Sequence, residues 1–224
     1  MPWLIYPALL LLCLLLAWLM VRQAAQFLEE YAGPALTQLQ QITVVAGFVT
    51  VILVMVLRQR STGISNADVL RLSLLFTWGI PLVLLDWRCF WLPLRFTSGF
   101  WLSGLLLTCL PASPVTLLAS LAGSGGMFAA LWVFRALANR AGGEERIGLG
   151  DVHLIAGLAA WYGWEMSCLL SAAGLCLLLV SALASRQRTL PYTPWLFVFL
   201  TSLALFHPLL LTGHFYDVIG IRPG

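Results

Sequence analysis

The chain has 224 residues, of which 61% are hydrophobic and 9% are charged, and its mean hydropathy is +0.94. A soluble domain could not expose this composition to water, so a lipid bilayer is the expected solvent. The net charge of +3 comes from twelve arginines scattered between apolar runs, which argues against a basic surface for nucleic acid. We therefore expect an all-α, polytopic membrane helix bundle with about six to eight transmembrane helices, since each span needs about 20 mostly apolar residues.

The first apolar run extends from Trp3 to Met20. It lacks a basic segment before it and a small-residue cleavage site after it, so we expect a retained helix rather than a signal peptide. A polar stretch follows from Arg22 to Gln41, and Gly33-Pro34 within it should end one helix before the next begins.

Seven further apolar runs follow, which gives eight expected helical segments in total. The run from Val152 to Tyr162 is too short to cross a bilayer unless a neighbouring segment joins it. The seven runs are Ile42 to Leu57, Val69 to Leu85, Phe96 to Leu110, Val115 to Leu137, Val152 to Tyr162, Met166 to Ala184 and Tyr192 to Leu211.

Arginine placement predicts the orientation, because short cytoplasmic loops collect positive charge. If the loop at 22–41 is cytoplasmic, eight arginines lie inside and four outside, and we prefer this orientation. Those expected inside are Arg22, Arg88, Arg95, Arg135, Arg140, Arg146, Arg186 and Arg188, and those expected outside are Arg58, Arg60, Arg71 and Arg222. The same orientation puts two aspartates, Asp86 and Asp151, on the cytoplasmic side.

Asp86 ends an apolar run, Leu82 to Leu85. A carboxylate at the C-terminus of a helix meets the negative end of the helix dipole, so nothing local favours it there. Pairing with Arg88 or simple exposure at the membrane boundary would explain the presence of Asp86 without any catalytic role.

Asp151 follows Gly148-Leu149-Gly150 and precedes a new apolar run. From its position alone it is predicted to be a helix N-cap. The two glycines allow backbone conformations that other residues avoid and let another chain approach closely.

Together, Asp86 and Asp151 suggest chemistry that neither suggests alone. Two carboxylates held close together share a proton, so that one can act as a general base on water while the other polarises a carbonyl group. Such a pair needs no metal or other cofactor. The expected reaction is hydrolysis of a peptide bond at the membrane boundary.

Other groups that could carry chemistry have weaker patterns. His153, His207 and His214 have no ligand spacing, and the five cysteines contain no C-x-x-C pair, so we expect no metal site and no disulfide framework. Glu144 and Glu145 precede the glycine loop, where a solvated loop is the simplest interpretation.

Three segments, in this order, resemble the type IV prepilin peptidases, which are membrane aspartyl proteases. Thr77 to Thr97 is similar to a family pattern of a helix, an aspartate, five residues and Leu-Pro. Gly148 to Trp164 resembles the second-aspartate segment of the family nearly throughout, with its Gly-x-Gly-Asp motif, and Leu190 to Trp195 is similar to a Pro-Phe-Gly-Pro element.

The resemblance implies that Asp86 and Asp151 are the catalytic pair. It also implies roles in substrate binding or loop shaping for five residues, which are Gly148, Gly150, His153, Pro93 and Pro191. The implied substrate is a prepilin or pseudopilin, whose basic leader would be cut off at the cytoplasmic face of a bacterial inner membrane, after a glycine and just before an apolar segment.

Many family members have a large cytoplasmic domain near the N-terminus, with paired C-x-x-C zinc motifs that are associated with N-methylation. The corresponding stretch here is the short loop at 22–41, which lacks cysteine. We therefore expect peptidase activity without bound zinc or methyl transfer. The expected organisation is a single membrane domain, 1–224, with an N-terminal helix and shortened loop (1–40), a peptidase core (41–212) and a tail (213–224).

Three other interpretations remain open. Presenilin-like proteases share Gly-Leu-Gly-Asp, but their Pro-Ala-Leu motif should follow the second aspartate, whereas both copies here, at 7–9 and 34–36, precede it. The aspartates could instead form an ion or proton relay in a small transporter, which would predict internal repeats that we do not find. A nonenzymatic assembly subunit of a pilus or secretion machine is the third interpretation.

Overall fold

The computed structural model describes residues 5–110, 113, 115–142, 147–187 and 189–212. These residues form seven α-helices and a short 3-10 helix, with no strand among them, so the predicted all-helical class is confirmed. The helices are α1 (Ile5–Glu30), α2 (Gln38–Thr62), α3 (Asn66–Cys89), α4 (Leu94–Leu107), α5 (Leu117–Gly142), α6 (Leu149–Ser185), α7 (Tyr192–Phe206) and η2 (Pro208–Leu211).

Five of the helices, α1, α2, α3, α5 and α6, are long and apolar enough to cross a membrane. The helices α4 and α7 have 14 and 15 residues and are shorter than a full span. Many leucines of α1 and α5 are exposed, as expected for helix surfaces that face lipid.

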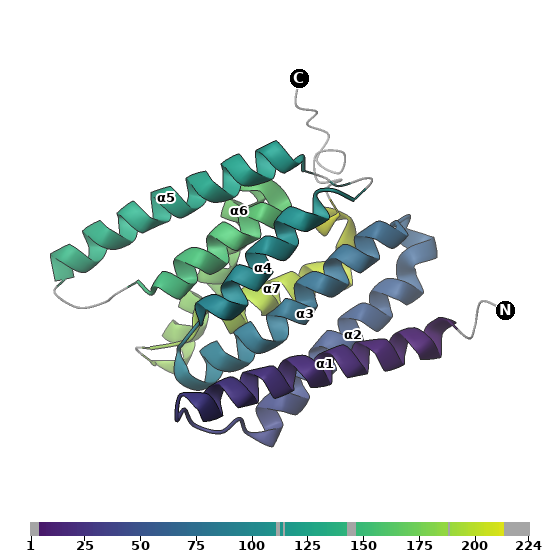
Figure 1. Cartoon of the computed structure of the whole chain (residues 1–224), viewed down its shortest axis with the longest axis horizontal. Helices are drawn as coiled ribbons and strands as arrows, with labels where there is room; N and C mark the ends of the chain where they lie inside the picture. Colours follow the sequence, from purple (N-terminus) through teal and green to yellow (C-terminus); the bar gives the residue numbers. More distant parts are fainter. Residues whose placement is uncertain (1–4, 111–112, 114, 143–146, 188, 213–224) are drawn as a thin grey trace.

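The helices run back and forth, so that their ends gather at two ends of the bundle. At the end on the left of Figure 1, α1, α3 and α5 end and α2, α4 and α6 begin. The described arginines expected in cytoplasmic loops belong to segments that meet at this end. Asp86 and Asp151 also lie there, one near the end of α3 and the other near the start of α6.

The turn between α1 and α2 lies where Gly33-Pro34 predicted a helix stop. The helix α1 continues past the predicted apolar run to Glu30, and the Gly33 N–H donates to the Leu28 carbonyl oxygen. Thr37 and Gln40 then form a capping box that starts α2. The polar stretch is therefore part helix and part tight connection.

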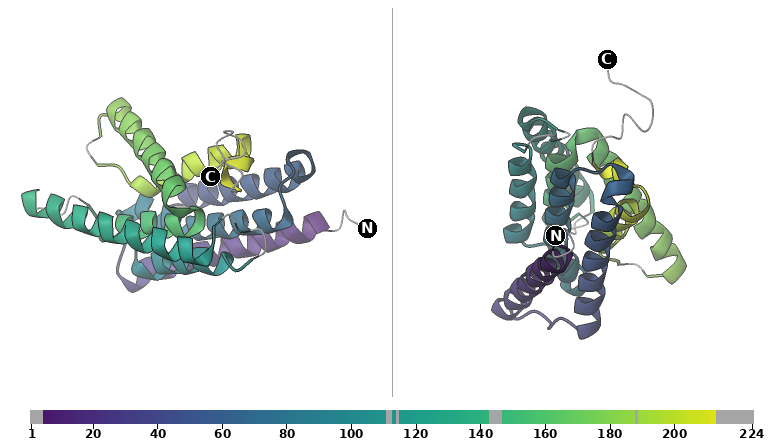
Figure 2. Two further views of the ribbon diagram at one scale, coloured as in Figure 1. Left: turned by 90° about the horizontal axis from the view of Figure 1, so that it is seen from above. Right: turned by 90° about the vertical axis from the view of Figure 1, so that its right-hand side faces the viewer.

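The helix α6 contains a break at Gly163, whose φ of 78° and ψ of 174° are non-helical. The part before the break contains the predicted Val152 to Tyr162 run, and the part after it contains the predicted Met166 to Ala184 run. The Ser167 hydroxyl donates to the Ile155 carbonyl oxygen across the break at 3.1 Å, so the chain folds back on itself. Figure 2 (left) shows the second part, in light green, leaning away from the other helices.

The helix α3 lies in the middle of the bundle and is the most buried of the five long helices. Its core side chains include Leu72, Leu75 and Leu84, which have no exposed surface. Through α3, the core connects α1 and α2 on one side with α4 and α7 on the other. Asp86 thus belongs to the most buried of the long helices.

Candidate active site

Asp86 lies in the last turn of α3 and only 5% of its surface is exposed. Its Oδ2 accepts a hydrogen bond of 2.7 Å from the backbone N–H of Thr193. Thr193 is the second residue of α7, whose N-cap is Pro191. The unpaired N–H groups and positive dipole end of α7 therefore stabilise a carboxylate that its own helix does not.

Arg88 is not the partner of Asp86 that the local sequence suggested. Its Nε donates to the carbonyl oxygen of Ala35 at 2.8 Å and ties the end of α3 to the turn between α1 and α2. The partner found for Asp86 lies 107 residues away in the sequence.

Asp151 lies in the first turn of α6 and is half-buried. The N-cap of this helix is Gly148, so the prediction of Asp151 as the N-cap is wrong by three positions. A Cβ on Gly148 would lie 3.3 Å from Oδ2 of Asp151, so the carboxylate turns back toward the start of its own helix. Both aspartates are thus close to helix N-termini.

The two aspartates line one cavity of about 1020 Å³. The cavity walls come from the end of α1, the connection between α3 and α4, both ends of α6 and the start of α7. Two separate helices therefore deliver one carboxylate each to a shared space.

Gly150 brings the start of α6 against the segment that follows Asp86. A Cβ at Gly150 would lie 2.5 Å from the Leu92 Cβ and 2.9 Å from the Leu92 carbonyl oxygen. No side chain fits against this backbone, so close approach of the two aspartate-bearing segments requires glycine here.

Four of the five residues expected to bind substrate or shape loops line the cavity, namely Gly148, Gly150, Pro93 and Pro191. Pro93 and Pro191 are also the N-caps of α4 and α7, the helices that begin beside the cavity.

His153 is placed differently from the other four. It does not line the cavity, and its ring lies edge-on to the rings of Trp101 and Phe128 between α4 and α5. Residues two positions apart on a helix point to different sides, which explains why Asp151 and His153 face different neighbours.

The end of α1 also lines the cavity, through Phe27, Glu30 and Tyr31. Phe27 and Tyr31 hold it there by edge-on contacts with Trp91, with ring centroids 4.9 and 5.3 Å apart. No motif in the sequence pointed to these residues. The only signal was an acidic pair, Glu29-Glu30, within the polar stretch at 22–41.

In the described part of the chain, no three His, Cys, Asp or Glu side chains are grouped so that they could hold a metal ion. All five cysteines are free. His214, Glu144 and Glu145 lie outside the described residues.

Residues 73–185 match the type IV leader peptidase family. The chain belongs to this family, whose members are proteases. It is 35% identical over 136 residues to leader peptidase HopD of Salmonella typhimurium, an alignment that covers 55% of this chain and 85% of that protein. Both aspartates lie within the matched residues.

A second relative is the type 4 prepilin-like proteins leader peptide-processing enzyme of Escherichia coli. It is 32% identical over 129 residues, which are 57% of this chain and 48% of that protein. The alignment therefore covers about half of this longer relative. No solved structure matches the chain significantly. The family match confirms the resemblance on which the sequence analysis rested, and the apolar helices agree with a membrane enzyme.

Proposed function

We propose that this protein removes the basic leader from a prepilin or pseudopilin. It hydrolyses one peptide bond of the substrate, which is held between the side chains of Asp86 and Asp151. The observation that supports the proposal best is the shared cavity, to which separate helices bring one aspartate each. Family membership gives the reaction class, and the cavity offers the two carboxylates that this class of hydrolysis needs.

Hydrolysis begins with one aspartate ionised and the other protonated. The carboxylate takes a proton from a water molecule as that water attacks the scissile carbonyl carbon, and the carboxylic acid donates its proton toward the carbonyl oxygen. When the tetrahedral intermediate collapses, the aspartate that took the proton from water gives it to the leaving amine. One hydroxyl of the intermediate returns its proton to the other aspartate, and the new carboxylic acid remains in the leader. The pair returns to its starting state with one proton between its two members.

The cavity is proposed to open toward the cytoplasm from a bacterial inner membrane. The arginine distribution supports this orientation, because it puts the aspartate-bearing end of the bundle on the positive side. Among the described residues of the cavity wall, Glu30 adds a third carboxylate and Arg95 is the basic residue. The charged residues described in this wall are mostly acidic, which suits a basic leader.

The test is co-expression with candidate prepilins and pseudopilins in a strain that lacks its own leader peptidases. We expect the substrate to shorten, with a new N-terminus directly before its apolar segment, when the products are examined by mass spectrometry. Full-length substrate throughout, with the protein present in the membrane, would contradict the proposal. Accessibility of cysteines introduced near the cavity to a membrane-impermeant reagent tests the orientation.

A further inference from the structure

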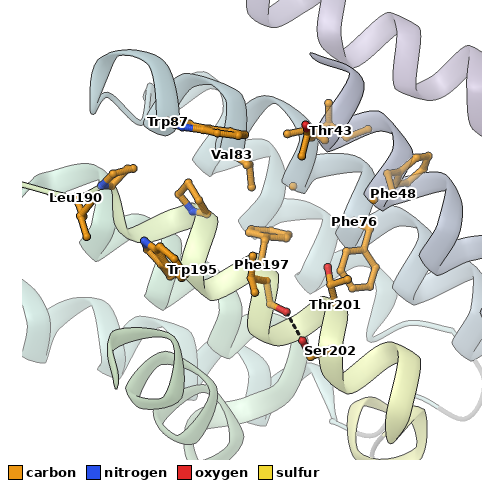
Figure 3. A pocket seen from close by; sticks show the side chains of 17 residues that line it. Thr43, Phe48, Phe76, Val83, Trp87, Leu190, Trp195, Phe197, Thr201 and Ser202 are labelled. Atoms are coloured by element: carbon orange, nitrogen blue, oxygen red, sulfur yellow. Dashed lines mark hydrogen bonds between the residues drawn. The ribbon is translucent and has the colours of Figure 1, made fainter. Parts of the chain in front are cut away.

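A second space, a groove of about 480 Å³, lies between α2, α3 and α7. Figure 3 shows aromatic and aliphatic side chains from all three helices around it, including Phe48, Phe76, Val83 and Phe197. The Ser202 hydroxyl in its wall donates to the carbonyl oxygen of Val198 within α7 at 2.9 Å. The surface offered to an occupant is therefore almost entirely apolar.

The groove begins where the aspartate cavity ends. Leu190 and Pro191 line both spaces, and Trp87, which directly follows Asp86, lines the groove. From Trp87 the wall continues along α3 to Phe76, a distance of about 16 Å at 1.5 Å per residue. The groove therefore leads from the aspartates toward the interior of the membrane.

We propose that this groove binds the apolar segment of the substrate that follows the scissile bond. The inference rests on the proposed peptidase function. A peptide held at the two aspartates must continue in both directions. The acidic cavity wall suits the basic leader on one side, and the apolar groove suits a membrane-embedded segment on the other.

Gly47 of α2 gives the groove room for such a segment. A Cβ added at Gly47 would have no atom within 4 Å, although the residue lines the groove. Small residues at helix surfaces allow another helix to approach closely within a membrane. A large side chain at Gly47 would extend into the groove without a clash at its Cβ.

The test compares Gly47→Phe with Gly125→Phe, a matched control on an exposed part of α5 where an added Cβ also meets no atom within 4 Å. Two substrates are used: a prepilin-type protein with its apolar segment, and a peptide that ends shortly after the scissile bond. For Gly47→Phe we expect the ratio of kcat/KM, long over short substrate, to fall at least tenfold. The control should keep the wild-type ratio.

An unchanged ratio in Gly47→Phe, with both substrates cleaved normally, would overturn the groove proposal and leave the peptidase function intact. If wild type cleaves neither substrate, the peptidase function fails and the groove proposal fails with it. A photo-crosslinking amino acid at Ser202 identifies the occupant directly. Cross-links to the apolar segment of the substrate support the proposal, whereas cross-links to lipid alone, with substrate bound, contradict it.

Discussion

At Asp86, the local helix and the folded protein act on the carboxylate in opposite ways. The last turn of α3 disfavours a negative charge, whereas the first turn of α7 donates a backbone N–H to it at 2.7 Å. Asp151 already lies in a favourable first turn, that of α6. The sequence predicted both residues as candidates, but it could not reveal the partner of Asp86, because that contact forms only when distant segments fold together.

Glu30 provides a prediction about leader recognition. Glu30→Gln should raise KM by about 1.4- to fivefold for a substrate with a basic leader, because a solvent-exposed ion pair contributes about 0.2–1 kcal/mol. The measurement is steady-state cleavage with basic and neutral leaders. Glu29→Gln is the control, since Glu29 is exposed and does not line the cavity. Equal effects of both substitutions on both leaders would contradict a direct role for Glu30.

Gly150 provides a second prediction at the same scale. Gly150→Ala should lower kcat at least about tenfold, because its Cβ would press on the Leu92 backbone and move the two aspartate-bearing segments apart. Gly126→Ala is the control, since its added Cβ would lie an ordinary 4.0 Å from the ring of Trp164. Wild-type kcat in a folded Gly150→Ala variant would show that this close approach is unnecessary.

Among the elements, α7 contributes through its N-terminus. Pro191 ends the connection from α6 and caps α7, so that the free N–H of Thr193 faces Asp86. The sequence predicted that a helix begins after Leu190-Pro191. It did not predict which side chain would accept a hydrogen bond from the start of that helix. The break in α6 was also only partly predictable. Two separate apolar runs were expected. In the structure they are the two parts of α6, which bends between them at Gly163.

Replacing the donor at the start of α7 tests this contact. Thr193→Pro removes the N–H and places proline in the first helical turn, where it is tolerated. A hydrogen bond to a charged group contributes about 1.5–3 kcal/mol, so we expect kcat to fall by about 10- to 100-fold. Thr193→Val, which keeps the N–H, should lose much less activity. Equal losses in the two variants would mean that the Thr193 hydroxyl, which both variants lack, matters rather than its N–H.

Over the whole molecule, contacts join the helices at both ends of the bundle. At the end opposite the cavity, a buried arginine makes these contacts. Arg71 of α3 is 4% exposed, lies 3.8 Å from Asp68 and donates to the Leu211 carbonyl oxygen of η2 at 2.6 Å. Hydropathy predicted the helical class and most helix positions. Arg71 was assigned to the outside only by counting arginines in alternate loops. Nothing in the sequence indicated that this residue joins two distant segments.

Arg71→Ala should lower the stability of the purified protein by about 3 kcal/mol, because it leaves Asp68 buried without its cation. The measurement is the thermal unfolding midpoint in detergent or lipid nanodiscs. Arg140→Ala, on an exposed part of α5, should change the midpoint little. A midpoint for Arg71→Ala equal to that of wild type would show that this buried contact does not stabilise the bundle.

The Asp86–Asp151 pair is tested most directly by measuring kcat for Asp86→Asn, Asp151→Asn and the control Glu29→Gln on one prepilin substrate in reconstituted membranes. Each asparagine variant should remain folded and lose about 10²- to 10⁴-fold in kcat, which is the usual contribution of a general acid or base. The control should cleave like wild type. If either asparagine variant, verified as folded, cleaves at the wild-type rate, the two-aspartate mechanism is contradicted.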